Sequence, residues 1–448
     1  MIDHRDSIDF ANTNIKKLFG QFFFPTLLGM LFSMAFILTD GIFVGNGIGP
    51  HGLAAINLVA PIFMLASGLG MMFGMGASVV AAIHLSQNNE KAARINVTQV
   101  FIAGVLVSLV MGLICYCFPR PVLSLIGARG LLYDAAYEYY IWFLPTCLLT
   151  MIESIGLFVI RLDGSPRYAM LSNIIPALVN IVLDYVFIFP CQWGLMGASL
   201  ATDLGGLVAV LMIGYYMVFK TKTLHLYRLK TTKKSLMLSL RNVGYMIRSG
   251  ASGLIGELAV AVMMLTGNLA FGKWLGTDGV SAYSVACYLF PVVYMIYSAV
   301  AQSAQPIISF NYGAGEQKRV FQTLSFSMTI SITLGLIVSI AFFLFPNEIV
   351  GIFISGGDAA VMASKGLPFY AAGFVFMAIN ICMAGYYQSV ERAGMAVLVT
   401  VLRGIIFIVI AFCVMPMLWG DYGLWLAVPV AEILTTLVVI ISQTAKKR

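Results

Sequence analysis

Residues 95–118 read INVTQVFIAGVLVSLVMGLICYCF, an unbroken stretch without a charged side chain. A helix needs about 20 apolar residues to cross the hydrocarbon core of a bilayer, so this stretch is long enough for one crossing. Barrel strands alternate apolar and polar residues over about ten positions, and this stretch does not. It therefore predicts a transmembrane helix.

The composition of the whole chain leads to the same class. Of its 448 residues, 60% are apolar and 10% are charged, whereas soluble globular chains hold roughly 45–50% apolar and about 25% charged residues. These figures exclude a soluble globular protein, a disordered chain, a coiled coil and a disulfide scaffold. We expect an all-α integral membrane protein.

Similar apolar runs, separated by polar or turn-rich breaks, predict twelve transmembrane helices. The predicted spans cover residues 18–45, 53–84, 95–118, 132–160, 168–190, 194–219, 248–272, 279–309, 320–345, 363–388, 395–418 and 422–443.

The longest polar connection, residues 220–247, divides these spans into two groups of six. We predict an N-lobe over residues 1–219, a basic cytoplasmic linker over 220–247 and a C-lobe over 248–448. The connection is also the one richest in Lys and Arg.

The two groups resemble each other in sequence. The pattern GxxGxxA at residues 49–55 recurs at 276–282, an offset of 227, and WGL at 193–195 corresponds to YGL at 422–424. Two halves with equal span counts and the same orientation form a parallel repeat. In such proteins the binding site lies between or within the halves, near the bilayer midplane.

The distribution of basic residues predicts the orientation of the chain. Of the 26 Lys and Arg, Arg403 lies inside a span and 21 lie on the same side as the N-terminus. The four on the opposite side are Arg120, Arg129, Lys273 and Lys365. Cytoplasmic loops carry the excess of Lys and Arg, which places both termini in the cytoplasm. The net charge of +7 thus reflects membrane topology, and no nucleic-acid partner is expected.

The fifth predicted span contains the most informative polar residues. Asn180 and Asp184 are four residues apart and face one side of a helix. Pro176 lies one turn earlier and cannot donate to the carbonyl of Ser172, which frees an acceptor. A carboxylate, an amide oxygen and a free carbonyl are suited to a proton or a small cation, whereas the alternative role for the pair is to bond a neighbouring helix.

Two further residues are candidates for the same site. Asp40 lies late in the first span, either at the membrane interface or facing Asp184. In the second case, two carboxylates in a dry cavity would share a proton near neutral pH, because desolvation and like charge both oppose a second ionisation. In the sixth span, Thr202 and Asp203 point about 100° apart, so we expect only one of them to face this cavity.

The other ionisable residues at membrane depth leave alternatives open. Glu153, Glu257 and Glu432 are either buried neutral groups or coupling residues. Arg403 either neutralises an acid or extends toward the interface.

Methionine-rich spans suggest an adaptable pocket for large apolar cations. The candidates are Met34, Met64 and Met72, although packing is the more frequent role of methionine in a span. No GxxxxGK[ST], HExxH or GxSxG motif is present, so neither ATP hydrolysis nor another enzymatic activity is expected.

Taken together, these features resemble the multidrug and toxic compound extrusion (MATE) transporters, and the resemblance covers nearly the whole chain. The shared features are the twelve spans in two six-helix lobes, Pro25 followed by Asp40, Asn180-x-x-x-Asp184, GASLAT at 197–202, and Gln305-Pro306 followed by NYGAG at 311–315.

The resemblance implies a cation-coupled antiporter that exports organic, often cationic, compounds by alternating access. It also implies a cation site in the N-lobe formed by Asp40, Asn180, Asp184 and Thr202, with Tyr139 as the counterpart of a helix-4 tyrosine. No cofactor, other metal ion or obligate protein partner is implied. H⁺ and Na⁺ both remain candidates for the coupling ion.

One departure from the family concerns the C-lobe. Another branch of the family binds sodium there through a helix-7 Glu and a helix-10 Asp. Glu257 matches the first, but residues 363–388 contain no acid. We therefore expect the coupling chemistry in the N-lobe.

Two other functions are weighed against the antiporter. A flippase for lipid-linked sugar precursors would need several basic residues facing the cavity, and Arg403 is the one basic residue well inside a span. The third alternative is a channel or a structural membrane protein. The sequence contains no stretch that resembles a repeated filter loop, and two pseudo-symmetric lobes suit a rocking motion better than conduction. The absence of organelle targeting and the compact loops favour a bacterial or archaeal inner membrane.

Overall fold

The computed structural model describes residues 8–128, 131–354 and 356–444, and this part of the chain is helical without a strand. Arg129, one of the four basic residues expected on the outer side, lies outside the described residues. The helices are α1 (Ile15–Gly47), α2 (Pro50–Ser86), α3 (Glu90–Cys117), α4 (Pro119–Leu125), α5 (Leu131–Leu162), α6 (Pro166–Ile188), α7 (Gly194–Tyr215), η1 (Tyr216–Lys220, a π-helical turn), α8 (Lys233–Gly313), α9 (Gln317–Leu344), α10 (Pro346–Gly351), α11 (Asp358–Ala371), α12 (Phe374–Ser389), α13 (Ala393–Val401), η2 (Leu402–Ile406, also π-helical) and α14 (Phe407–Thr444).

The twelve predicted spans are confirmed once the breaks inside the long helices are counted. Within the described ranges, nine helices are long and apolar enough to cross a membrane, and the pair α11–α12, bent by 48°, makes a tenth. Helix α8 is interrupted at Gly276 (φ 68°), and α14 is interrupted at Trp419 and Gly420 (φ 56°). Each of these breaks separates two of the predicted spans.

The chain forms two compact units, which we describe separately. The first contains residues 1–254 and 309–316, and the second contains residues 255–308 and 317–448. The boundary between the two units therefore falls twice within α8.

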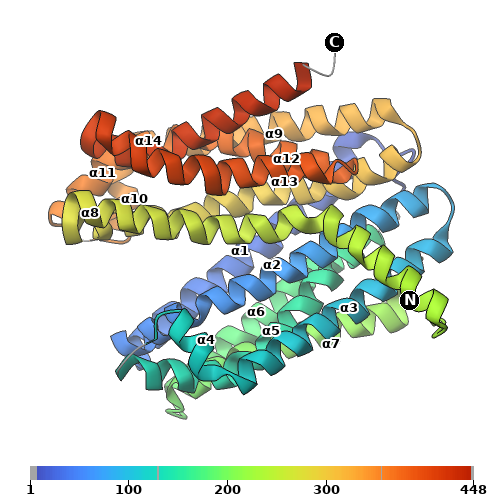
Figure 1. The fold of residues 1–448 in the computed structure, drawn as a ribbon, viewed down its shortest axis with the longest axis horizontal. Coiled ribbons are helices and arrows are strands. Elements are labelled where there is room, and N and C mark those ends of the chain that lie inside the picture. Colours follow the sequence, from blue (N-terminus) through green and yellow to red (C-terminus); the bar gives the residue numbers. More distant parts are fainter. Residues whose placement is uncertain (1–7, 129–130, 355, 445–448) are drawn as a thin grey trace. The chain divides into compact units, whose positions relative to one another are not determined.

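In the first unit, α2 packs along α5, α1 along α6, and α7 against both α5 and α6 (Figure 1). Glycines allow the closest of these approaches. A Cβ on Gly76 would overlap the backbone carbonyl of Met246, and one on Gly250 would overlap that of Met72. The first turns of α8 are thus packed directly on the backbone of α2.

In the second unit, α12 packs against α9, α13 and α14, and α11 packs against α14 (Figure 1). Its core is rich in aromatic side chains. Phe271 stacks on Tyr283 with ring centroids 4.5 Å apart, and the edge of Trp425 meets Phe271 at 4.9 Å.

Polar contacts fix the chain that connects α7 to α8. The buried Asp163 carboxylate accepts hydrogen bonds from the Tyr216 hydroxyl, from the Thr223 hydroxyl and from the backbone N–H groups of residues 222–224, at 2.7–3.0 Å. From α3, Arg94 donates to the carbonyl of Thr223 at 2.6 Å. The connection is therefore held against the first unit, and from Lys233 onward it is already part of helix α8.

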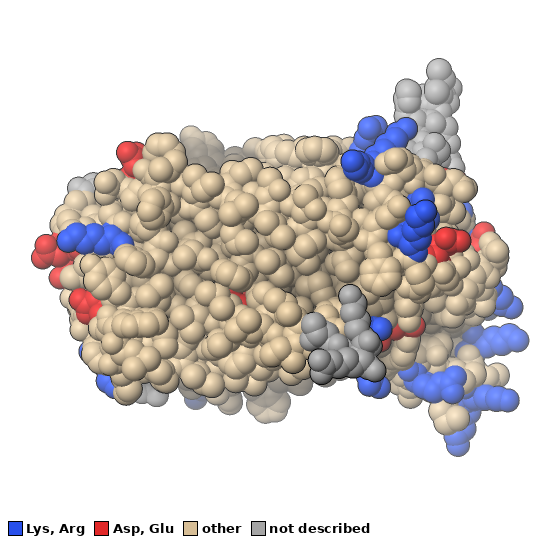
Figure 2. Space-filling view, turned by 90° about the horizontal axis from the view of Figure 1, so that it is seen from above, with Lys and Arg blue, Asp and Glu red and all other residues tan. Residues whose placement is uncertain are grey.

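The surface in view in Figure 2 is consistent with a membrane environment. Basic side chains crowd one end of it, a mixture of acids and bases occupies the other end, and the broad region between is nearly free of charge. Many large apolar side chains of the helices are exposed, among them Leu106, Leu113 and Leu211. Such surface is expected to face lipid.

Candidate functional site

Helix α6 carries the two residues around which the site is formed. Asp184 is fully buried and Asn180 is 3% exposed. Gly205 allows α7 to approach their side of α6, because a Cβ there would lie 3.0 Å from the Cβ of Asn180 and 3.2 Å from the carbonyl of Pro176. The predicted polar face of the fifth span is therefore enclosed by a neighbouring helix.

The amide of Asn180 connects α6 to α7. Its Nδ2 lies 3.4 Å from Thr202 Oγ1, to which it donates, and that hydroxyl donates to the carbonyl of Ala198 at 3.1 Å. The structure thus brings Asn180 and Thr202 together, as the sequence predicts.

Four acceptor atoms of this group have no hydrogen-bond donor in the part of the chain that the structure describes. Oδ1 of Asn180 and both carboxylate oxygens of Asp184 are buried and unpaired, and so is Oδ1 of Asp40 from α1. Buried polar atoms are normally satisfied, since each unpaired one costs about 1–3 kcal/mol. Four such acceptors in one unit are the expected composition of a site for a proton or a cation.

The two carboxylates and a tyrosine are neighbours. Asp40 lies within electrostatic reach of Asp184, and Tyr139 of α5 lies within reach of both. Tyr139 is buried, and Tyr137 and Glu138, beside it in sequence, are exposed. Tyr140 is also buried, but its hydroxyl donates to the carbonyl of Cys115 at 2.7 Å, so Tyr139 is the tyrosine of this stretch that lies near the two acids. We call Asp40, Asn180, Asp184 and Thr202 the first-unit site.

Asp203 points away from Thr202 and has a partner of its own. The hydroxyl of Thr146, on α5, donates to its carboxylate. Asp203 is still within electrostatic reach of Tyr139. Asp203 therefore lies at the edge of the first-unit site, and one of its carboxylate oxygens accepts a hydrogen bond from α5.

Two predicted secondary residues stay outside this group. Glu153 is half-buried on α5, and no hydrogen bond joins it to the site among the described residues. Glu257, on α8, belongs to the second unit, where it lies within electrostatic reach of Tyr294.

The three methionines proposed for a pocket differ in their surroundings. Met72 packs in the core of the first unit among residues that include Phe73 and Met246. Met34 is also buried, and Met64 is half-buried. A role for them in a substrate pocket remains a prediction.

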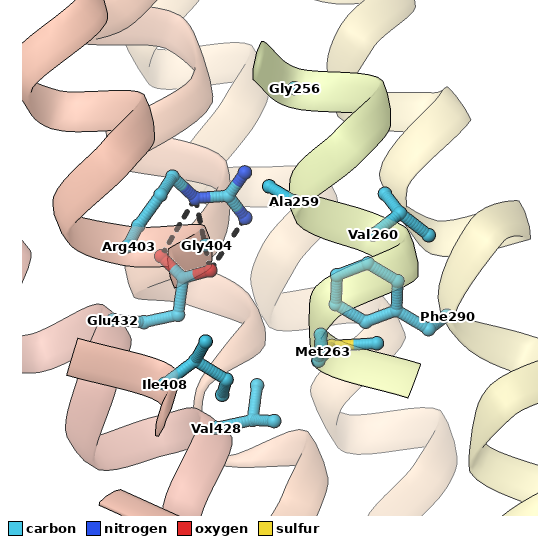
Figure 3. A pocket seen from close by; sticks show the side chains of 10 residues that line it. All are labelled: Gly256, Ala259, Val260, Met263, Phe290, Arg403, Gly404, Ile408, Val428 and Glu432. Carbon is cyan, nitrogen blue, oxygen red and sulfur yellow. Dashed lines mark hydrogen bonds and ion pairs between the residues drawn. The ribbon is translucent and has the colours of Figure 1, made fainter. Parts of the chain in front are cut away.

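The second unit contains a buried charge pair. Arg403 donates through Nε to both oxygens of Glu432, at 3.1 and 3.2 Å, and through Nη2 to Oε1 at 2.5 Å (Figure 3). Both residues are buried, at 6% and 3% exposed. Of the two alternatives for Arg403, the structure shows neutralisation of an acid.

Other side chains complete this pair. Asn380 on α12 donates to Glu432 Oε2 at 2.7 Å and accepts from Thr436 at 3.1 Å. The guanidinium also lies 5.8 Å from the ring centroid of Tyr294. Figure 3 shows the pair beside a small cavity lined by Met263 and other apolar residues.

The sequence pointed to neither Thr146 nor Asn380, although a signal existed for their acidic partners. The offset of 229 that relates residues 193–195 to 422–424 also relates Asp203 to Glu432. Both acids are hydrogen-bonded to a preceding helix of the same unit. A search at that offset would have drawn attention to the pair.

The oxygen atoms of the first-unit site suit H⁺ or Na⁺. Among the described residues, no group of three or more His, Cys, Asp or Glu is placed to hold a metal ion. Carboxylate, amide and hydroxyl oxygens remain available, and these are the ligands that hard cations prefer.

Comparison with known proteins gives one consistent result. The MatE family profile matches residues 25–186 and 254–413. The multidrug export protein MepA of Staphylococcus aureus is 23% identical over 435 residues, which cover 96% of this chain and 93% of that protein. The MepA of Staphylococcus saprophyticus is equally similar, at 23% over 437 residues.

Solved structures share the fold. The MATE transporter VcmN of Vibrio cholerae aligns with a TM-score of 0.89 at 19% identity, over 97% of both chains. A MOP superfamily transporter from Pyrococcus furiosus aligns with a TM-score of 0.85 at 22% identity, over 98% of both chains. Because the family profile covers well over half of the sequence, the chain belongs to the MatE family.

Proposed function

We propose that this chain is a secondary antiporter that exports organic, often cationic, compounds in exchange for H⁺ or Na⁺. The observation that carries the proposal is the set of four buried, unpaired acceptor oxygens on Asp40, Asn180 and Asp184. The export of drugs is also what the names of its MepA relatives describe.

The chemistry of the site supports coupling to a cation. Two carboxylates in an apolar interior, with no buried base beside them, are costly to keep ionised. A proton or Na⁺ removes that cost by supplying the missing charge. Release of the ion on one side, and its replacement by another ligand or ion, would then couple two fluxes through one site.

Asn180 and Thr202 hold the site in shape in this proposal. The amide donates one hydrogen bond to the hydroxyl, and the hydroxyl donates to the helix backbone, so these donors are directed at the protein. Their remaining oxygen lone pairs are available to a cation together with the carboxylates.

The flippase alternative is not favoured. Recognition of a pyrophosphate requires basic groups that are free to bind it. Arg403, the basic residue deep in a span, is instead paired with Glu432 inside the second unit. We further propose that the crowded basic end of the molecule faces the cytoplasm, with both termini on that side.

The test is ethidium efflux from proteoliposomes, driven in turn by an imposed proton gradient and an imposed sodium gradient. We expect gradient-driven efflux from the parent protein and a loss of at least tenfold for Asp184→Asn, because the amide cannot take up the coupling charge. Folding is checked by thermal unfolding in detergent.

Asp134→Asn is the matched control, since Asp134 is exposed in the first turn of α5. It should retain the parent rate. Full coupled efflux by Asp184→Asn would remove Asp184 from the mechanism, and failure of the parent with both gradients would reject the antiport of a lipophilic cation.

A further inference from the structure

The segment that connects α7 to α8 and forms the first turns of α8 is rich in basic residues. Between Asp203 and Glu257 the sequence contains no Asp or Glu. The same interval contains eight Lys and Arg, which are Lys220, Lys222, Arg228, Lys230, Lys233, Lys234, Arg241 and Arg248. No acid of the interval is available to neutralise them.

The first turns of α8 present two different faces. The inner face is fixed on α3, because Gln99 donates to Ser239 at 2.8 Å and accepts from Asn242 at 3.4 Å. One turn further, Met246 is fully buried in the core of the first unit. The orientation of this helix about its axis is thus determined.

The outer face combines basic and apolar side chains. Lys234, Arg241 and Arg248 are exposed and spaced by seven residues, which places them in one row along the helix. Met237 and Leu240, which follow the row around the helix, are 69% and 67% exposed, and Leu236, further round, is 61% exposed.

Exposed apolar side chains also occur in η1, ahead of the connection. Val218 and Phe219, in η1, are 64% and 72% exposed. Lys220 reaches back over the rings of Tyr168 and Tyr215, at 5.7 and 5.8 Å from their centroids. A lysine stem laid along apolar surface with its charge at the edge is typical of a membrane interface.

This surface is held in place rather than being a loose loop. Asp163 fixes residues 222–224, as described above, and Thr98 of α3 accepts from the backbone N–H of Tyr227 at 2.8 Å. The basic and apolar side chains that follow are therefore displayed from an ordered backbone.

We propose that this surface binds anionic phospholipids of the adjoining leaflet. We call it the α8 surface, formed by Lys234, Leu236, Met237, Leu240, Arg241 and Arg248. Helix α8 continues from this surface directly into a membrane span. The exposed Leu236, Met237 and Leu240 therefore lie beside the bilayer. An exposed apolar strip combined with a basic row, with no acid near it in sequence, fits acyl chains and negatively charged headgroups together.

The test measures lipid preference at the surface itself, separately from transport. A tryptophan is introduced by Met237→Trp, and its fluorescence is quenched with brominated phosphatidylglycerol or brominated phosphatidylcholine in reconstituted membranes. The signal of the parent protein with its five native Trp is subtracted. The quantity compared is the lipid ratio, the association of phosphatidylglycerol divided by that of phosphatidylcholine. We expect this ratio to be about ten at low salt and to fall in high salt.

Charge removal then identifies the residues responsible. Lys234→Gln/Arg241→Gln/Arg248→Gln in the same background should bring the ratio to about one. The matched control, Arg120→Gln/Lys273→Gln/Lys365→Gln, removes three exposed charges predicted on the opposite side and should leave the ratio unchanged.

Three outcomes would overturn the proposal. A ratio near one in the Met237→Trp protein denies a preference for anionic lipid. An equal fall in the control variant denies that the α8 surface is its origin. Absence of quenching by either lipid places the surface in water, where a soluble anionic partner would have to cover it.

Discussion

Asp184 and Glu432 are both buried carboxylates at membrane depth, yet their surroundings are opposite. Glu432 accepts three hydrogen bonds from Arg403 and one from Asn380. Neither oxygen of Asp184 accepts any. One acid therefore has its counter-charge within the protein, whereas the other has no hydrogen-bond donor among the described residues, as the proposed cation site would need.

This difference predicts the effect of removing the guanidinium. Arg403→Met leaves Glu432 buried without its counter-charge, which should destabilise the second unit by about 3–5 kcal/mol. The double variant Arg403→Met/Glu432→Gln removes both charges and should recover most of that loss. Thermal unfolding in detergent measures the stability of the single and the double variant against the parent protein.

A single variant as stable as the parent would show that Glu432 is neutral or solvated despite its burial. A double variant as unstable as the single one would assign the loss to packing instead of charge.

The residues of the first-unit site were predictable because their signal is local. Asn180 and Asp184 lie one turn apart on one helix, and an acid in an apolar run is conspicuous by itself. The pairing of Arg403 with Glu432, and of Thr146 with Asp203, joins residues 29 and 57 positions apart on different helices. Such pairs depend on how the helices pack, which composition and spacing do not encode.

At the scale of helices, glycine determines the closest contact in the first unit. Gly250→Ala should cost about 1–3 kcal/mol, because its Cβ would overlap the Met72 carbonyl and neither backbone can yield easily. Gly244, on the same helix, has no neighbouring atom within 4 Å of the position that a Cβ would occupy. Gly244→Ala should therefore be neutral or stabilising by up to about 1 kcal/mol.

Unfolding of both variants under identical conditions checks this pair of predictions. Equal stabilities would mean that α8 does not pack on α2 as closely as the structure shows.

The helices themselves were largely predictable from long apolar runs, and their interruptions were not. The sequence prediction missed the short helices α4 and α10, which are too brief to give a periodic signal. It also treated residues 363–388 as one span, whereas the structure bends it between α11 and α12. There Gly373 lies against the backbone of Pro429, a contact that becomes visible only once α14 is in place.

At the scale of the whole molecule, the charge distribution predicts an orientation that labelling can test. Cys191 is exposed in the connection between α6 and α7, on the side opposite to the proposed cytoplasmic face. A membrane-impermeant maleimide should therefore label Cys191 in intact cells, as located by peptide mapping. A cysteine introduced by Thr231→Cys should be labelled only after permeabilisation.

Labelling in the reverse pattern would invert the topology and place the α8 surface on the outer leaflet. Labelling of both sites from outside would contradict the single membrane crossing, by α7 and η1, that separates the two positions.

The assignment of the start of α8 to the first unit has a consequence for fragments of the chain. A cut within residues 221–232 would leave Lys233–Leu254 attached to the second fragment, although Met246 completes the core of the first. The two fragments would then share an interface already built for non-covalent association. Co-expressed as separate polypeptides, they should reassemble and copurify, as the pieces of a split protein do.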